Sequence, residues 1–294
     1  MTIDTPVPGT TRFLDMTGGR LAYDDTGGDG ELILAIPGMG DLRGAYRHLR
    51  PALVAAGYRL VTMDVRGFGE TTAGWDDYSA RAVGHDALAL INALGAADAV
   101  ILGNSFAAGS ALWAARDAPT RVRGVVLLGP IVRDLAIAPT VMLAFQVGFG
   151  GPWRHEFWTA YWDALFITHR PVDHADYRAR LLKNIAEPGR MDALMAMLTL
   201  SKADTAAIVA ESDVPALVVM GSRDPDFDDP TEEAVRLATM LSAGSLIVGG
   251  VGHYPHLETP EAVAAAIAPF LGSLPMPARR QRQYCNRTVQ GSAH

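Results

Sequence analysis

The chain has 294 residues, enough for one large domain or for a domain that carries an inserted subdomain. Hydrophobic residues make up 49% of it and charged residues 19%, a composition typical of soluble globular proteins. The formal net charge of −7 would repel nucleic-acid phosphates, so we expect no nucleic-acid partner. The single cysteine, Cys285, excludes an intrachain disulfide.

The amino-terminal segment contains neither a positively charged stretch nor an apolar core, and therefore does not resemble a signal peptide. No apolar run reaches the ~18 residues that a membrane-spanning helix needs. We therefore expect a cytoplasmic protein with no membrane partner. The basic cluster Arg279, Arg280 and Arg282 is interpreted as part of a solvated tail. The sequence does not determine the oligomeric state.

Short β-rich runs alternate with longer helical runs along most of the chain. This pattern predicts an α/β fold with a mostly parallel sheet and helices on both faces. The predicted strands span residues 12–16, 20–25, 31–36, 58–64, 99–103, 122–128, 216–221 and 245–248. The predicted helices span residues 45–56, 80–94, 106–117, 231–241 and 260–271.

The alternation stops between residues 130 and 208, where the chain becomes helical and rich in aromatic residues and methionine. A structureless loop of this length would be unusual inside a compact domain, so we interpret residues 130–208 as an inserted helical lid. The alternative is a set of extra core helices with no gating role. We expect residues 1–129 and 209–274 to form the core and residues 275–294 to form a disordered tail.

Ser105 is the candidate nucleophile. It lies in Gly103-Asn104-Ser105-Phe106-Ala107, directly between a predicted strand and a predicted helix. A tight turn at this junction would project the hydroxyl above the sheet edge, and small residues two positions before and after it allow the two backbones to approach. No other serine of the chain has glycine two positions earlier. The alternative is an ordinary turn serine or helix cap.

His253 is the candidate base, because a serine hydroxyl needs a base within hydrogen-bond reach. It lies in the glycine-rich loop after the last predicted strand, and His256, three residues later, is the rival. Asp224, after the strand at residues 216–221, is the candidate acid that orients the imidazole. Asp226, in the same loop, and Asp134, after the strand at residues 122–128, remain alternatives.

The turn Pro37-Gly38-Met39-Gly40 follows a predicted core strand. The backbone N–H of Met39, together with that of Phe106 at the start of a helix, is expected to form an oxyanion hole. No cluster of histidine, cysteine or aspartate has metal-ligand spacing, so we expect no metal. A dinucleotide cofactor is disfavoured because no Gly-x-Gly-x-x-Gly follows the first strand of a βαβ unit. We expect no other cofactor.

From about residue 10 to 272 the chain resembles the α/β-hydrolase superfamily. Five motifs carry the resemblance, in this order: Pro37-Gly38-Met39-Gly40, Asp64-Val65-Arg66-Gly67-Phe68-Gly69, Gly103-Asn104-Ser105-Phe106-Ala107, Gly221-Ser222-Arg223-Asp224 and Gly252-His253-Tyr254-Pro255-His256. The order serine, acid, histidine is that of this fold. The resemblance implies an α/β-hydrolase fold and a hydrolase that uses a serine nucleophile.

Three positions bear on which branch of the superfamily the chain resembles. Pro37-Gly38 stands where the family usually has His-Gly, but the donor there is a backbone N–H and function can survive the change. Ser105 argues against the haloalkane dehalogenase and epoxide hydrolase branches, which use a carboxylate nucleophile. Asn104 resembles the Gly-Asn-Ser elbow of hydrolases that cleave carbon–carbon bonds in ring-fission products.

The predicted lid holds three of the five tryptophans. Trp158 and Trp162 are four residues apart and would share one helix face, and together with Tyr254 they are our candidate substrate-binding residues. The plainer interpretation is that the aromatic face is the core of the lid itself. The sharper hypothesis is that an apolar acyl or leaving group binds between the lid and the turn at Ser105.

The sequence therefore predicts acyl transfer on a small, apolar, ester-like or related carbonyl substrate. A carbon–carbon bond hydrolase or a cofactor-free haloperoxidase or perhydrolase would use the same three side chains. A ligand-sensing relative with slow turnover is the non-catalytic alternative.

Overall fold

The computed structural model describes residues 11–275, and within them an eight-stranded sheet forms the centre of the molecule in the order β1-β2-β4-β3-β5-β6-β7-β8. The strands are β1 Arg12–Met16, β2 Gly19–Asp25, β3 Leu32–Ile36, β4 Arg59–Met63, β5 Ala99–Asn104, β6 Val122–Leu128, β7 Ala216–Gly221 and β8 Gly244–Val248. All neighbouring pairs from β4 to β8 are parallel, whereas β1 and β2 form an antiparallel edge. The predicted mostly parallel sheet is confirmed.

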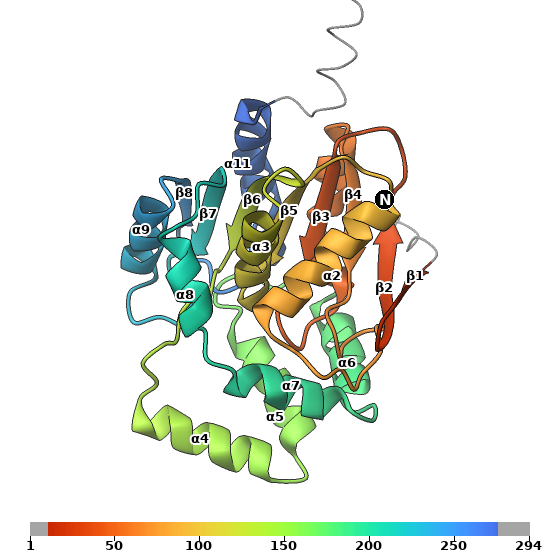
Figure 1. Cartoon of the computed structure of the whole chain (residues 1–294). Helices are drawn as coiled ribbons and strands as arrows, with labels where there is room; N and C mark the ends of the chain where they lie inside the picture. Colours follow the sequence, from red (N-terminus) through yellow and green to blue (C-terminus); the bar gives the residue numbers. More distant parts are fainter. Residues whose placement is uncertain (1–10, 276–294) are drawn as a thin grey trace, which may run out of the picture.

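Helices cover both faces of this sheet, as Figure 1 shows for α2 and α3 on one side and α11 on the other. The helices of the core are η1 Arg43–Tyr46, α1 Arg50–Ala55, α2 Ala80–Ala93, α3 Phe106–Asp117, α9 Pro230–Met240, α10 Pro255–Glu258 and α11 Pro260–Ser273. Of the predicted tail at residues 275–294, the structure describes only Pro275. The basic cluster Arg279, Arg280 and Arg282 and the single cysteine Cys285 lie outside the described residues.

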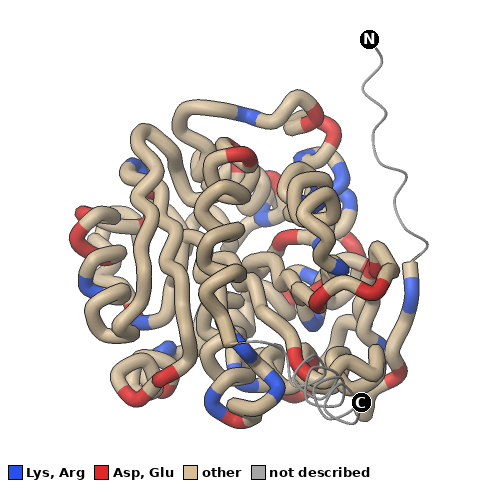
Figure 2. The backbone as a smooth tube through the Cα atoms, turned by 90° about the horizontal axis from the view of Figure 1, so that it is seen from above, with Lys and Arg blue, Asp and Glu red and all other residues tan. Residues whose placement is uncertain are grey.

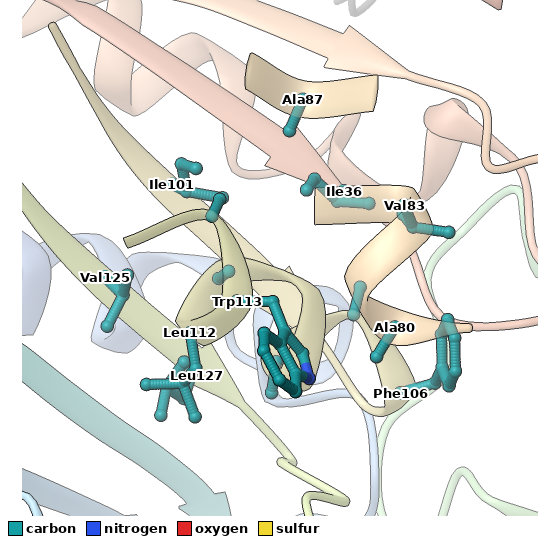
Figure 3. Close-up of a cluster of buried hydrophobic side chains, with 14 of the residues drawn as sticks. Ile36, Ala80, Val83, Ala87, Ile101, Phe106, Leu112, Trp113, Val125 and Leu127 are labelled. Atoms are coloured by element: carbon teal, nitrogen blue, oxygen red, sulfur yellow. The ribbon is translucent and has the colours of Figure 1, made fainter. Parts of the chain in front are cut away.

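The strands of the sheet send alternate side chains to two hydrophobic cores. Leu34 of β3 and Val125 of β6 face α2 and α3, whereas their neighbours Ile33 and Val126 face α1 and α11. Figure 3 shows the first of these cores, where strand side chains such as Ile101 meet side chains from α2 and α3. Burial on both faces explains why central strands such as β3 and β7 are continuous apolar runs in the sequence.

One predicted element differs in the structure. The helix predicted at residues 45–56 is divided into the short 3₁₀ helix η1 and the helix α1, which begins at Arg50. Pro51 explains the difference, because proline has no N–H and fits only the first turn of an α-helix. The sequence predicted helical structure here but did not reveal the break.

Five helices lie between β6 and β7, where the insertion was predicted: α4 Pro139–Gly150, α5 Arg154–Ala164, α6 His174–Ile185, α7 Arg190–Thr199 and α8 Ala203–Val209. In Figure 1, α4 to α7 gather below one edge of the sheet. The edge they cover is the one at which the parallel strands end. A gating role for this segment, and the exact domain boundaries, remain predictions.

The described surface carries both signs of charge. Lys and Arg positions are interspersed with Asp and Glu positions around the tube in Figure 2. Among the described helices, none is both long enough and apolar enough to cross a membrane.

Gly84 is expected to be essential for the packing of α2 against α3. A Cβ at this position would lie 2.7 Å from the carbonyl oxygen of Ser110 and 3.1 Å from the backbone nitrogen of Ala114. We expect Gly84→Ala to lower the free energy of unfolding by ~1–3 kcal/mol, because backbone atoms of α3 must move to admit the methyl group. Urea denaturation followed by circular dichroism measures the effect.

Gly272 is the matched control, because it is also helical and a Cβ there would meet nothing within 4 Å. Gly272→Ala is expected to leave the protein as stable as before or to stabilise it by up to ~1 kcal/mol, through helix propensity alone. Equal effects of the two substitutions would contradict the packing argument.

Candidate active site

Ser105 occupies a strained turn between β5 and α3. Its backbone has φ 55° and ψ −122°, and it is one of two non-glycine residues with positive φ among those described. Its N–H donates to the carbonyl of Leu128 at 2.9 Å, and its carbonyl accepts from the N–H of Ile131 at 3.2 Å. Such a conformation persists only where the surrounding structure enforces it, and it is often associated with function.

Small residues around Ser105 make this turn possible. A Cβ on Gly103 would overlap the carbonyl oxygen of Ala107, so the strand before the turn requires glycine. Ala107, which stands where the commonest motif has glycine, is fully buried in the core between the sheet and α2 and α3. The side-chain amide of Asn104 donates to the carbonyl of Leu128 at 2.9 Å, which ties the turn to β6 a second time.

The turn after β3 lies directly against Ser105. A Cβ on Gly38 would lie 3.2 Å from Cβ of Ser105, so the backbone of this turn passes next to the candidate nucleophile. The N–H of Asp41 donates to the carbonyl of Gly38 at 3.3 Å and closes the turn. Met39 therefore lies inside a tight turn beside Ser105. Phe106 opens α3, where the first N–H groups have no acceptor within the helix.

His253 and Asp224 are in contact. Nδ1 of His253 lies 2.7 Å from Oδ2 of Asp224, and each residue is only 1% exposed. Burial alone would lower the pKa of His253, but the carboxylates of Asp224 and Asp226 outweigh it and raise the pKa to about 9. Oδ2 of Asp226 lies 3.5 Å from the same ring nitrogen.

The ring of His253 also lies close to the serine turn. A Cβ on Gly129 would be 3.3 Å from Nδ1 of His253. Gly129 follows Leu128, whose carbonyl binds the N–H of Ser105. The N–H of His253 donates to the carbonyl of Leu165 at 3.0 Å, so the inserted segment fixes the histidine loop from the other side.

The other candidate base and acid have different surroundings. His256 is completely buried and its ring stacks on Tyr46 with centroids 5.0 Å apart. Burial lowers its pKa to about 3, and neither ring nitrogen has a hydrogen-bond partner in the described part of the chain. Asp134 is exposed and accepts from the Ser201 hydroxyl at 2.6 Å and from the Lys202 N–H at 2.8 Å, at the start of α8.

The three candidate substrate-binding residues do not lie together. Trp158 of α5 packs on the turn after β3, and its indole N–H donates to the carbonyl of Gly40 at 3.2 Å. Trp162 and Tyr254 belong to a separate buried cluster, in which Trp162 is fully buried and stacks on His174. Trp162 is thus a buried packing residue between the insertion and the loop that carries Tyr254, as in the plainer interpretation of the aromatic face.

Sequence reasoning missed a buried carboxylate, Asp41, at the end of the turn after β3. It accepts from the Tyr177 hydroxyl at 2.6 Å and from the Trp162 indole N–H at 3.3 Å. Burial raises the pKa of Asp41, and the donated hydrogen bonds oppose that rise. A single aspartate after a turn carries no sequence signal for burial, because its partners lie more than a hundred residues away.

The insertion also contributes an unexpected hydrogen bond to the loop after β7, which carries Asp224 and Asp226 and is called the acid loop below. The hydroxyl of Tyr161, on α5, donates to Oδ1 of Asp226. In the sequence, Tyr161 is one of several aromatic residues of the predicted lid, and nothing next to it points to this contact. One atom each from Asp224, Asp226 and His253 lies within 4.8 Å of the others, so these three side chains could also hold a cation. The expectation of no metal therefore stays a prediction.

Comparisons with known proteins agree with this architecture. A family model described as alpha/beta hydrolase fold matches residues 31–260. The chain is 24% identical to Epoxide hydrolase A of Mycobacterium tuberculosis, over 90% of this chain and 98% of that protein. It is 35% identical to 2-hydroxy-6-oxo-6-phenylhexa-2,4-dienoate hydrolase of Burkholderia cepacia, over 38% of this chain and 40% of that protein.

A solved structure with the same fold is the bromoperoxidase from Bacillus anthracis. The two structures superimpose with a TM-score of 0.77 at 20% sequence identity. The superposition covers 90% of this chain and 100% of the bromoperoxidase chain. The family model spans most of the described sheet and its helices, including the turn at Ser105. The chain belongs to the α/β-hydrolase fold family and is a hydrolase.

Proposed function

We propose that this enzyme is a serine hydrolase that transfers the acyl group of a small, apolar, ester-like or related carbonyl substrate to Ser105 and then to water. The observation that carries the proposal is the buried 2.7 Å contact between His253 Nδ1 and Asp224, beside a serine held at positive φ. The carboxylate holds the ring so that Nε2 can accept the proton of the serine hydroxyl.

In this mechanism His253 takes the proton from Ser105 as its oxygen attacks the substrate carbonyl. The N–H groups of Met39 and Phe106 donate to the oxyanion of the tetrahedral intermediate. The imidazolium then gives its proton to the leaving alcohol, which departs and leaves an acyl-serine. Water, deprotonated by the same imidazole, attacks the acyl-serine and releases the acid, and Ser105 regains its proton.

A second candidate is hydrolysis of a carbon–carbon bond. It is favoured by Asn104 before the serine and by the similarity to the Burkholderia cepacia relative, whose name describes a dienoate hydrolase. Haloperoxidase or perhydrolase chemistry and a slow ligand sensor would use the same side chains. Turnover assays with a ring-fission dienoate, with peroxide and with simple esters separate these possibilities.

We expect Ser105→Ala to lower kcat for ester hydrolysis by at least about 10³-fold, because the nucleophile is lost. A fluorophosphonate probe should label the wild-type protein at Ser105 and should not label the variant. Ser245→Ala, on the exposed side of β8, is the control and should be labelled like the wild type. Unchanged turnover by Ser105→Ala would exclude this mechanism.

We expect kcat/KM to rise with the length of the acyl chain in a series of p-nitrophenyl esters. The reason is the aromatic cluster of α4 and α5, in which Trp158 covers the turn after β3 and contacts Phe149 and Tyr161. Each methylene group buried there would contribute about 0.8 kcal/mol, or roughly fourfold. Trp158→Ala should weaken the rise of kcat/KM with acyl-chain length. Equal turnover of acetate and of longer or aromatic esters by the wild type would count against an apolar pocket.

The pH profile provides a further test. Protonated His253 cannot accept a proton, and its pKa is raised to about 9. Activity of the free enzyme should therefore rise as the pH increases from neutral to about 9, and should fall as the ring becomes protonated below that value. The measurement is kcat/KM at each pH, from initial rates of the wild type after subtraction of the rate measured with Ser105→Ala. A profile that is already flat at neutral pH would show that the carboxylates do not hold the proton on the ring.

A further inference from the structure

The loop after β7 places two carboxylates around one imidazole. Oδ2 of Asp224 lies 2.7 Å from Nδ1 of His253, and Oδ2 of Asp226 lies 3.5 Å from the same atom. The backbone N–H of Asp226 donates to Oδ1 of Asp224 at 3.1 Å and so orients the Asp224 carboxylate within the loop. Pro225, between them, restricts the backbone of this turn.

The second carboxylate is held from the opposite side by the insertion. The Tyr161 hydroxyl donates to Oδ1 of Asp226, which leaves Oδ2 facing His253. Burial and the nearby negative charge raise the pKa of Tyr161 well above its usual value, so the phenol keeps its proton and remains a donor. The Tyr161 ring is itself fixed by an edge-on contact with Phe145 of α4, at 5.5 Å between centroids.

A second buried carboxylate beside the first is unfavourable unless each has a compensating partner. The Asp226 side chain is 13% exposed, and burial and the charge of Asp224 both raise its pKa. The Tyr161 hydroxyl and the imidazole of His253 oppose that rise. The pKa of Asp226 is therefore raised overall, and the imidazole of His253 and the Tyr161 hydroxyl limit that rise.

We propose that Asp226 is a second positioning residue for His253, and that Tyr161 of α5 keeps its carboxylate directed at the ring. Asp224 and Asp226 together stabilise the imidazolium that forms during acyl transfer, and Asp226 takes over the orienting role when Asp224 is removed. This inference rests on the proposed function of Ser105 and His253.

Other titratable groups also face His253 and are present in every variant below. They are Asp41 from the turn after β3, Tyr254 from the histidine's own loop and His256 from α10. Because these groups are unchanged, a difference in pH profile between variants measures the effect of Asp224, Asp226 and Tyr161 on the pKa of His253.

The first test compares Asp224→Asn, Asp226→Asn and the double variant in kcat/KM for a p-nitrophenyl ester. We expect the double variant to lose about 10⁴-fold, the loss typical of a base without an orienting carboxylate, and Asp224→Asn to retain at least about tenfold more activity than the double variant. If Asp224→Asn and the double variant are equally impaired, Asp226 does not take over the orienting role and the proposal is wrong.

The second test measures the pH midpoint of kcat/KM, which a purely structural role would not move. Asp226→Asn should shift the midpoint to lower pH by about one pH unit, because one negative charge beside the imidazolium is lost. Tyr161→Phe should shift it in the same direction, because the carboxylate is no longer held at the ring. Midpoints identical to that of the wild type in both variants would overturn the proposal.

Two control variants match these substitutions. Asp228→Asn removes an exposed carboxylate from the same loop, and Tyr78→Phe removes a phenol hydroxyl that accepts hydrogen bonds from the N–H groups of Gly74 and Trp75. Both should leave the pH midpoint unchanged. Circular dichroism and thermal unfolding of every variant establish that it is folded before its kinetics are compared.

The outcomes separate this inference from the proposed function. If the fluorophosphonate probe does not label Ser105 in the wild type, the proposed function itself fails. If labelling succeeds but the Asp226 and Tyr161 variants behave like their controls, only the present inference fails. Wild-type activity that is lost in EDTA and restored by a divalent cation would identify Asp224, Asp226 and His253 as metal ligands, and would also overturn the positioning role.

Discussion

The strained backbone at Ser105 is the constraint to which the other parts of the candidate site are fitted. A serine at positive φ stays there because β6 binds it through the carbonyl of Leu128, and because Gly103 leaves room for the carbonyl of Ala107. The turn after β3 approaches closely, since a Cβ on Gly38 would lie only 3.2 Å from Cβ of Ser105. The contacts with Leu128 and Ala107 are made by backbone atoms, which side-chain rearrangement cannot replace.

The parallel sheet brings the remaining groups to the same place. Strands β3, β5, β7 and β8 run in the same direction, so the loops that follow them emerge at one edge. This edge carries the turn at Gly38, the serine turn, the Asp224 loop and the His253 loop. Fold and site are therefore linked by topology, since ligands and catalytic groups of open α/β sheets gather at the carboxyl ends of strands.

Helix α5 connects parts of this edge that are far apart in the sequence. Within two turns it binds the Gly40 carbonyl through Trp158, Asp226 through Tyr161 and Asp41 through Trp162. These residues share one helix face because they are three and four positions apart. A displacement of α5 would therefore disturb the turn after β3 and the acid loop together.

The surroundings of two histidines show how strongly position controls proton affinity. His253 and His256 are three residues apart and both are buried. The first faces two carboxylates, which raise its pKa to about 9, whereas the second packs on Tyr46, and burial lowers its pKa to about 3. The same residue type, three positions apart, is thus suited to hold a proton in one case and to exclude it in the other.

The sequence by itself determined the order of strands and helices, the strand-to-helix turn at Ser105 and the position of the helical insertion. These features depend on neighbouring residues, such as the apolar run of β5, Gly103 and the helical residues after Phe106. It did not reveal that Pro51 divides a predicted helix, since the apolar pattern continues across the break. Only the tertiary structure decided which aspartates face His253, that Tyr161 reaches Asp226, and that Trp162 is buried between the insertion, Asp41 and Tyr254. Those contacts join residues tens of positions apart, so they arise from the packing of whole elements and leave no pattern in the local sequence.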